Sequence, residues 1–172
     1  MKLTIVSSSV RVERKTHKVA KALFDLATER NIEASLVDLQ TIDLPEFGKP
    51  LNEHKLALKN QLQEQLMASE AFIFVTPEYN GFFSSALKSF VDYFSNGPFK
   101  NKKIGVATVT SGPLGGIRAA QMLQLQILGL FGLPIPNMLL TGLVDKKIND
   151  EYEILEMDYL SKVNSYLDQF SS

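Results

Sequence analysis

The chain has no cysteine among its 172 residues and only two histidines. Without cysteine there can be no disulfide framework, no thiolate nucleophile and no sulfur-ligated metal site. An excess of charge of one sign is also missing, because the formal net charge is -1. The surface therefore has no field that would gather nucleic acid or an anionic membrane, and we expect neither as a partner. The strongly acidic surface of small electron-shuttling proteins is absent too.

Long apolar runs are missing as well. None approaches the roughly 18–20 residues that a membrane-spanning helix needs, and the chain starts with the strand-like KLTIV instead of a signal peptide. We therefore expect a cytoplasmic protein. Hydrophobic residues make up 45% of the chain, which is sufficient for one core in a single domain covering residues 1–172.

Apolar residues alternate between strand-like runs and helix-like spacing along the chain. The runs predict five strands, at residues 3–6, 34–39, 71–75, 103–110 and 134–140. Helical spacing predicts helices that follow them, at about residues 19–31, 58–66, 87–94, 117–131 and 160–170. This order predicts an α/β protein with a parallel sheet and helices on both faces. The loops after the first, third and fourth strands would open on one edge, where such sheets bind ligands.

The first of these loops, residues 7–17, is rich in hydroxyl groups and cations. They are Ser7, Ser8, Ser9, Thr16, Arg11, Arg14 and Lys15, with His17 beside them. The loop ends where a helix begins, and the free N–H groups and dipole of a helix N-terminus stabilise a phosphate. Neither the G-x-x-x-x-G-K-[ST] nor the G-x-G-x-x-G pattern is present. The alternative is that the serines cap the helix and the basic side chains form a solvated surface.

The third loop contains Pro77, Glu78, Tyr79, Asn80 and Gly81. Backbone amides, an amide side chain and an aromatic ring suit a planar heteroaromatic ligand. The alternative is a simple strand-to-helix turn, in which Asn80 and Gly81 tolerate a positive φ. Glu78 has no visible catalytic partner, so a structural or hydrogen-bonding role is favoured over that of a general acid.

The fourth loop runs from Ser111 and contains Gly112, Gly115 and Gly116. Glycine lets a backbone approach a ligand closely or adopt a positive φ. Arg118 follows at the predicted helix start, where a cation is unfavourable unless it has an anionic partner. The alternative is a glycine-rich connector with Arg118 in solvent. Together the three loops predict a phosphate site and a flat-ring site on one rim, as flavin mononucleotide (FMN) requires, at the switch point of strand order 2-1-3-4-5.

Three motifs resemble the NAD(P)H-dependent FMN reductase family, which includes quinone, azo-dye and chromate reductases of flavodoxin-like fold. The family's first-loop pattern G-S-x-R is similar to Ser8-Ser9-Val10-Arg11, and its T-P-E-Y-N segment stands intact at residues 76–80. Its glycine-rich S-x-G-x-x-G-G-x-R-A pattern is similar to residues 111–119. The resemblance spans residues 3–140 and implies a flavodoxin-like three-layer sandwich with a five-stranded parallel sheet in order 2-1-3-4-5.

The resemblance also implies the cofactor and its ligands. FMN would be the cofactor, with NADPH or NADH as electron donor and a quinone, azo compound, metal oxyanion or free flavin as acceptor. The implied phosphate ligands are Ser9, Arg11, Arg14 and Thr16, with His17 next to the phosphate. The implied ring ligands are Pro77, Glu78, Tyr79, Asn80 and Gly81, with Ser111, Gly112, Gly115 and Gly116 opposite. Hydride would pass through N5 of the flavin, so no catalytic side chain and no metal are expected.

The chain departs from the family pattern at three places. Ser8 replaces a usual glycine, Ser84-Ser85 stands where relatives often have Pro-Gly, and Phe82-Phe83 makes the mouth of the site unusually aromatic. An alternative function is a flavodoxin-like electron carrier without NAD(P)H oxidation, although carriers have a less basic phosphate loop. A response-regulator receiver is excluded, because it needs acidic residues after the first strand and a phosphorylatable Asp where Pro77 stands.

The predicted helix at residues 117–131 is apolar on two stripes. One contains Leu123, Ile127, Leu130 and Phe131, and the other contains Met122, Leu125 and Leu128. A helix that covers a sheet needs only one such stripe. We therefore expect a homodimer or tetramer with the flavin sites near the interface, unless the C-terminal helix covers the second stripe.

Overall fold

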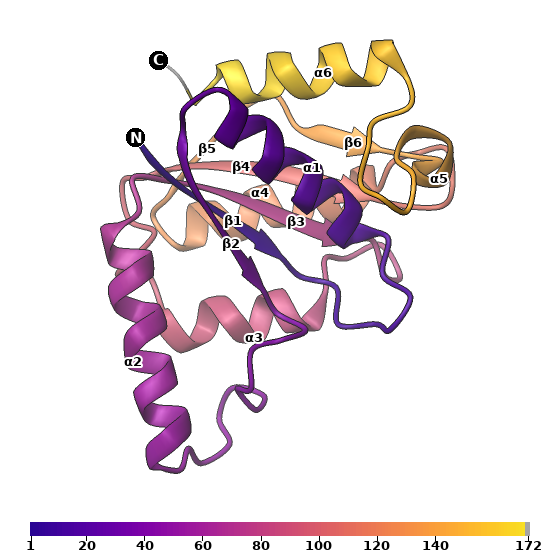
Figure 1. Cartoon of the computed structure of the whole chain (residues 1–172). Helices are drawn as coiled ribbons and strands as arrows, with labels where there is room; N and C mark the ends of the chain where they lie inside the picture. Colours follow the sequence, from indigo (N-terminus) through magenta and orange to yellow (C-terminus); the bar gives the residue numbers. More distant parts are fainter. Residues whose placement is uncertain (171–172) are drawn as a thin grey trace.

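The computed structural model describes residues 1–170, in which a parallel sheet is surrounded by helices (Figure 1). The strands are β1 (Lys2–Ser7), β2 (Glu33–Asp38), β3 (Ala71–Pro77), β4 (Lys103–Val109), β5 (Leu133–Pro134) and β6 (Leu139–Thr141). The helices are α1 (Thr16–Glu29), α2 (Glu53–Ala68), α3 (Ser85–Phe94), α4 (Ile117–Gly129), α5 (Val144–Lys147) and α6 (Met157–Asp168). The order is β2-β1-β3-β4-β5, with β6 also paired to β4, and every pair is parallel. The predicted strand order is confirmed.

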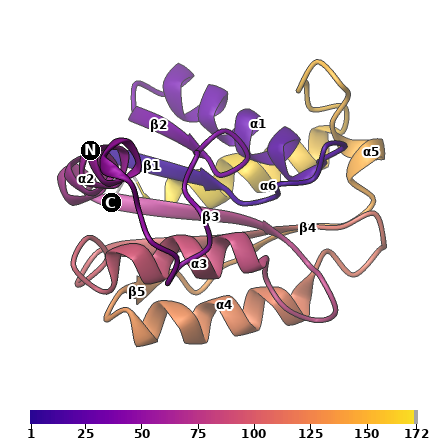
Figure 2. The same ribbon diagram turned by 90° about the horizontal axis from the view of Figure 1, so that it is seen from below.

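Helices cover both faces of the sheet, as the sequence predicts. Figure 2 shows α1 and α6 on one side and α3 and α4 on the other. The central strand β3 is buried along its whole length, which explains its unbroken apolar sequence. Its successive side chains alternate between the two cores, with Ile73 and Val75 in the core under α1 and α6, and Phe72 and Phe74 in the core under α3 and α4.

The prediction of one continuous fifth strand at residues 134–140 is wrong. The segment is divided into β5, which pairs with Lys103 and Ile104, and β6, which pairs with Ala107–Val109. Pro134 and Pro136 have no N–H group to donate to a ladder, so a continuous strand could not form here. The predicted helix over residues 117–131 also ends early, at Gly129. Phe131 has a positive φ of 55° and exposes its ring to solvent.

Helix α6 packs on the sheet where β4 has a glycine. A Cβ atom on Gly105 would lie 2.3 Å from Tyr166 Oη and 2.7 Å from Phe170 Cζ. The Tyr166 hydroxyl fills this space and is buried without a hydrogen-bond partner among residues 1–170, and burial raises the pKa of Tyr166 well above its usual range. Because α6 and α4 lie on opposite faces (Figure 2), α6 does not cover the second apolar stripe of α4.

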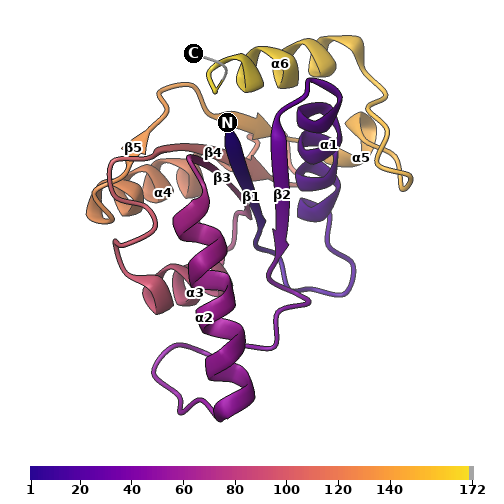
Figure 3. The same cartoon turned by 60° about the vertical axis from the view of Figure 1, so that its left-hand side comes forward.

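The segment between β2 and α2 lies against α3. The Phe47 amide donates to Ser89 Oγ (2.8 Å), and Tyr93 Oη donates to the Pro45 carbonyl (2.9 Å). Helix α2 then begins well outside the sheet, and its first turns project away from it (Figure 3). In α2 only Leu62 and Leu66 are buried. No helix within residues 1–170 is long and apolar enough to cross a membrane.

Candidate functional site

The carboxyl ends of β1, β3 and β4 surround a cavity of about 390 Å³. Its lining residues come from all three loops that the sequence singled out: Ser9, Arg11, Glu13, Arg14, Lys15, Thr16, Pro77, Glu78, Tyr79, Val109, Thr110 and Ser111. The remaining predicted ligands lie outside this lining: His17, Asn80, Gly81, Gly112, Gly115 and Gly116. The structure therefore brings the three loops together around one cavity.

Three consecutive buried serines at the end of β1 each contact a different element. The Ser7 hydroxyl lies 3.3 Å from His17 Nδ1 of α1, and the Ser8 hydroxyl donates to the Val75 carbonyl of β3 (2.9 Å). The Ser9 hydroxyl lies 3.3 Å from Tyr79 Oη of the third loop. None of these serines caps α1, because the N-cap position is Lys15 and it forms no side-chain cap. The first N–H groups of α1 therefore remain available to an anion at the cavity, except for the Lys18 amide, which donates to the Lys15 carbonyl (3.1 Å).

The cations of the first loop differ in their partners. Arg14 forms a salt bridge with Asp38 at the end of β2, and both side chains are largely buried. Lys15 pairs with Asp145 of α5. The Arg11 guanidinium is exposed and forms no hydrogen bond or ion pair with any described residue. Arg11 is thus the cation free to bind a phosphate, whereas Arg14 is held by Asp38. Sequence reasoning missed Asp38, because it lies within the strand predicted at residues 34–39, whereas in the structure it is the last residue of β2.

His17 lies next to the first loop but outside the lining of the cavity. Its Nδ1 atom is 3.3 Å from Ser7 Oγ and 3.6 Å from Asp38 Oδ2, and its ring packs edge-on against Tyr152. Burial lowers the pKa of His17, and the positive charge of Arg14 lowers it further, against the opposing effect of Asp38. His17 therefore favours its neutral form and has a structural role in supporting the first loop.

Replacing His17 by glutamine is expected to remove a part of the protein's acid sensitivity. The folded state holds the imidazole pKa below its ordinary value of about 6.5, so the unfolded chain takes up the proton first. The wild-type free energy of unfolding should therefore fall as the pH drops below about 6.5. In His17→Gln this contribution disappears, and urea denaturation at pH 8, 6.5 and 5.5 measures it. His54→Gln, at an exposed position of α2, is the control. If the free energy of unfolding changed with pH equally in wild type and His17→Gln, His17 would not be the source of this acid sensitivity.

The third loop is a tight turn closed by two backbone hydrogen bonds between Tyr79 and Phe82, of 2.8 and 3.0 Å. Asn80 and Gly81 occupy its two central positions with φ of 52° and 83°. Positive φ at both positions is typical of a type I′ turn, which favours the Asn-Gly pair. Asn80 and Gly81 thus shape the turn, while Pro77, Glu78 and Tyr79 face the cavity.

Glu78 connects the third loop to the start of α4. One carboxylate oxygen lies 3.4 Å from Arg118 Nε, and the other accepts from the Ala119 amide (3.4 Å). The N-cap of α4 is Gly116, which has no side chain to cap the helix. Glu78 therefore caps α4 from a distant segment and is also the anionic partner that Arg118 needs at a helix N-terminus. This is a hydrogen-bonding role rather than that of a general acid.

Gly115 and Gly116 both adopt a positive φ, of 64° and 81°. A Cβ on Gly116 would lie 3.0 Å from Thr108 Cβ, and the Thr108 hydroxyl donates to the Gly115 carbonyl (2.6 Å). These glycines let the fourth loop fold back on the end of β4. Sequence reasoning missed Thr108, because nothing in a strand sequence shows which hydroxyl meets the following loop.

Gly142, directly after β6, is a third residue that sequence reasoning missed. A Cβ at this position would lie 2.5 Å from the Pro113 carbonyl oxygen. The next amide, of Leu143, donates to the Gly112 carbonyl (3.1 Å). Gly112 thus helps to anchor the fourth loop to the end of the sheet. A glycine just after the predicted last strand is the one signal that could have indicated this contact.

The cavity has two chemically different ends. At one end, the uncapped N-terminus of α1 lies with the hydroxyls of Ser9 and Thr16 and the unpaired Arg11, which suits a phosphate. At the other end, Tyr79 and the backbones of the third and fourth loops suit a flat heteroaromatic ring. These residues fit FMN. No cluster of His, Asp and Glu within residues 1–170 could hold a metal ion.

A parallel sheet in order 2-1-3-4-5 with such a cavity at the β1/β3 switch point defines a flavodoxin-like, flavin-binding α/β protein. The family model described as NADPH-dependent FMN reductase matches residues 1–143. The chain belongs to this family, and it is an FMN-dependent oxidoreductase that uses NAD(P)H.

The most similar proteins agree with this assignment. The NADPH azoreductase of Bacillus sp. (strain OY1-2) is 28% identical over 170 residues, covering 97% of this chain and 93% of the relative. The FMN-dependent NADPH-azoreductase of Staphylococcus aureus (strain USA300) is 27% identical over 182 residues, covering 100% of this chain and 94% of the relative. Among solved structures, FerB, a flavoenzyme NAD(P)H:(acceptor) oxidoreductase from Paracoccus denitrificans, superimposes with a TM-score of 0.78 at 20% identity, covering 98% and 94%. At that identity FerB shows a shared fold.

Proposed function

We propose that the protein transfers electrons from NADPH through FMN to a flat aromatic acceptor, either an azo compound or a quinone. The observation that carries this proposal is the meeting of three loops around one cavity with a phosphate-binding end and a ring-binding end. FMN, when bound, supplies the hydride and electron chemistry, and the protein supplies binding and orientation. The azoreductase names of the two sequence relatives support the choice of acceptor.

The chain's own residues would hold the cofactor at both ends. Arg11, the hydroxyls of Ser9 and Thr16 and the first amides of α1 bind the phosphate, which fixes the position of the ring along the cavity. Pro77 and Tyr79 line the ring from the third loop. The Glu78 contacts with α4 keep the third and fourth loops at a constant separation.

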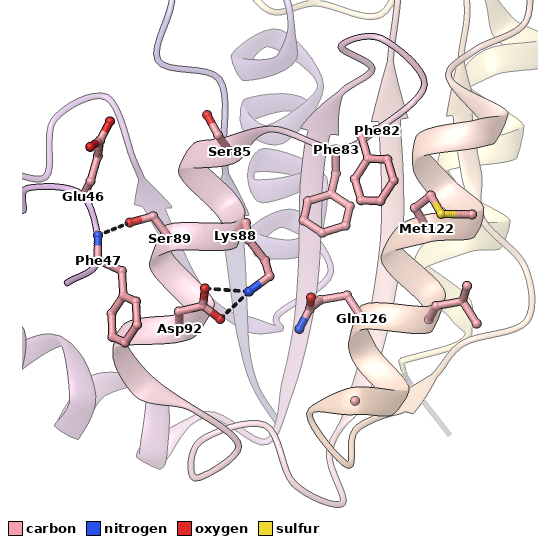
Figure 4. Close-up of a pocket in the computed structure, with 12 residues that line it drawn as sticks. Glu46, Phe47, Phe82, Phe83, Ser85, Lys88, Ser89, Asp92, Met122 and Gln126 are labelled. Carbon is pink, nitrogen blue, oxygen red and sulfur yellow. Dashed lines mark hydrogen bonds and ion pairs between the residues drawn. The ribbon is translucent and has the colours of Figure 1, made fainter.

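The mouth of the site favours an apolar ring as acceptor. Phe82 is 52% exposed directly after the ring-binding turn, and its ring lies 5.4 Å from that of Phe83. Figure 4 shows these two rings side by side between α3 and α4, near Met122. They line a groove of about 770 Å³. Aromatic and thioether side chains contribute apolar contact to an azo dye or quinone, and none to a small metal oxyanion.

The proposal is tested with purified protein and FMN. We expect the protein to take up FMN, to lose the oxidised flavin absorbance when NADPH is added without oxygen, and to recover it on addition of an azo dye or quinone. Chromate serves as the comparison and should reoxidise the holoprotein more slowly. Failure to bind FMN, or a reduced holoprotein that neither acceptor reoxidises, would contradict the proposal.

We further propose that the face formed by α3 and α4 is the interface of a homodimer. Its exposed apolar residues are Phe47, Phe82, Leu125, Leu128 and Phe131, each more than half exposed. Single exposed apolar residues are normal, but Phe47, Phe82 and Leu125 line the same groove, and such a group is typical of an interaction surface. The small net charge does not oppose self-association. A second copy on this face would place its own groove residues beside the mouth of the flavin site.

The double substitution Leu125→Glu and Leu128→Glu is expected to convert the dimer to a monomer at micromolar concentration. Two carboxylates on the second stripe of α4 would lose their hydration in the interface without a partner. Light scattering or sedimentation measures the mass. Leu155→Glu is the matched control. Leu155 is 56% exposed on the α6 side of the sheet, so this variant should stay dimeric. A monomeric wild type would contradict the proposal.

A further inference from the structure

Ser8 and Ser84 are both buried, with 0% and 2% exposure, and they contact each other across 76 positions of sequence. The Ser84 hydroxyl lies 2.8 Å from the Ser8 carbonyl and 3.0 Å from the Ser8 hydroxyl. These are two of the three places where the chain departs from the pattern of the family that it resembles. The two departures are therefore one structural feature, which we call the serine pair.

The hydrogen bonds of the serine pair form a consistent chain of donors. The Leu87 amide donates to Ser84 Oγ (3.2 Å), Ser84 Oγ donates to Ser8, and Ser8 Oγ donates to the Val75 carbonyl (2.9 Å). The Ser84 amide also donates to Thr76 Oγ1 (3.0 Å). Every buried hydroxyl of the pair is thus satisfied. Ser84→Ala would remove the donor to both the Ser8 carbonyl and the Ser8 hydroxyl, whereas in Ser8→Ala the Ser84 hydroxyl would keep the Ser8 carbonyl as its acceptor and lose the contact with the Ser8 hydroxyl.

The serine pair lies between the two halves of the flavin site. Ser8 is adjacent to Ser9 in the phosphate-binding loop, and Ser84 follows the ring-binding turn and caps α3. A second, longer hydrogen bond joins these loops, between Ser9 Oγ and Tyr79 Oη at 3.3 Å. The spacing between the phosphate end and the ring end of the cavity therefore depends on the serine pair.

We propose that Ser8 and Ser84 are positioning residues that set FMN affinity by holding the phosphate-binding loop in register with the ring-binding loop. The inference rests on the assignment of FMN to this cavity. With the pair intact, the cavity exists before FMN arrives. Without it, the loops sample other separations, and FMN binding must reorder them at a cost in free energy. A contact that only stabilises the fold would affect the apo and FMN-bound forms equally and leave the affinity unchanged.

The chain provides two matched controls for this distinction. Thr4 and Ser69 form another buried hydroxyl pair, 2.7 Å apart, and Ser69 lies just before the start of β3, away from the carboxyl ends of the strands. Asn52 caps α2 as Ser84 caps α3, by accepting from the Lys55 amide (2.9 Å). Ser69→Ala and Asn52→Ala thus remove a buried hydroxyl and a helix cap without touching the cavity.

The experiment titrates FMN into the apo forms of wild type and variants and follows the quenching of flavin fluorescence. We expect Ser8→Ala and Ser84→Ala each to weaken FMN binding by roughly five- to tenfold, the loss expected for one or two buried hydrogen bonds. The FMN-induced rise in melting temperature should be smaller in both variants than in wild type. The two controls should melt at lower temperature yet bind FMN within about twofold of wild type.

The double variant Ser8→Ala, Ser84→Ala tests whether the two residues act as a unit. We expect its loss of FMN affinity to be smaller than the two single losses combined, because both substitutions remove the hydrogen bond between the two hydroxyls. If either single variant fails to fold, Ser8→Gly takes its place. Unchanged affinity in the Ser8 and Ser84 variants, or an equal loss in all four single variants, would overturn the proposal. A wild type that binds no FMN would instead contradict the assignment of the cavity.

Discussion

Replacing Arg11 by alanine is expected to weaken FMN binding by roughly 10- to 100-fold, the range for one charge-assisted phosphate contact. Riboflavin, which lacks the phosphate, should bind wild type and Arg11→Ala almost equally. The reason is that, of the two arginines in the cavity lining, the Arg11 guanidinium has no partner among residues 1–170, so its charge is available to the ligand. Fluorescence titration with both flavins measures the difference, and Arg11→Lys should be intermediate because lysine cannot make a bidentate contact.

Two further variants show whether a loss of FMN affinity in Arg11→Ala comes from the lost phosphate contact. Arg30→Ala removes an arginine that pairs with Asp168 of α6, at the opposite end of α1, and should leave the affinity for both flavins unchanged. Arg14→Ala should instead lower the stability of the protein, since it leaves the mostly buried Asp38 without its main partner. A parallel loss of FMN and riboflavin binding in Arg11→Ala would show that Arg11 does not act through the phosphate.

The second large effect is expected on stability. Gly105→Ala should lower the free energy of unfolding by about 3 kcal/mol, at the upper end of typical overpacking costs. The new Cβ would lie 2.3 Å from Tyr166 Oη and 2.7 Å from Phe170 Cζ, so α6 must move away from β4. Urea denaturation at pH 7 measures the change. Gly129→Ala is the control, because a Cβ at this helical position meets nothing within 4 Å and should be neutral or slightly stabilising.

Tyr166→Phe tests whether the Tyr166 hydroxyl is the group that clashes with the new Cβ atom in Gly105→Ala. Alone it should raise the free energy of unfolding by about 1 kcal/mol, because it removes a buried hydroxyl without a partner. Combined with Gly105→Ala it should restore part of the lost stability, since the nearest clashing atom is gone while Phe170 remains. Strict additivity of the two substitutions would contradict a direct contact between these residues.

The sequence by itself determined the layers of the fold and the edge that holds the site. The unbroken apolar run of β3 and the helical spacing of Leu87, Phe90, Val91 and Phe94 are local patterns, and local patterns specify which face of an element is buried. Alternation of strands and helices then places the loops after β1, β3 and β4 together. The residues that line the cavity could therefore be predicted in large part from motifs and spacing.

The tertiary structure alone decided which side chains of those loops are free and which are committed. Arg14 and Arg11 are equivalent in the sequence, and only the position of Asp38 at the end of β2 distinguishes them. The cap that Glu78 provides to α4 and the Ser8–Ser84 pair likewise join residues 41 and 76 positions apart. Such partnerships depend on how separate elements pack, because a hydrogen bond needs its two atoms within about 3 Å and no local pattern encodes that distance.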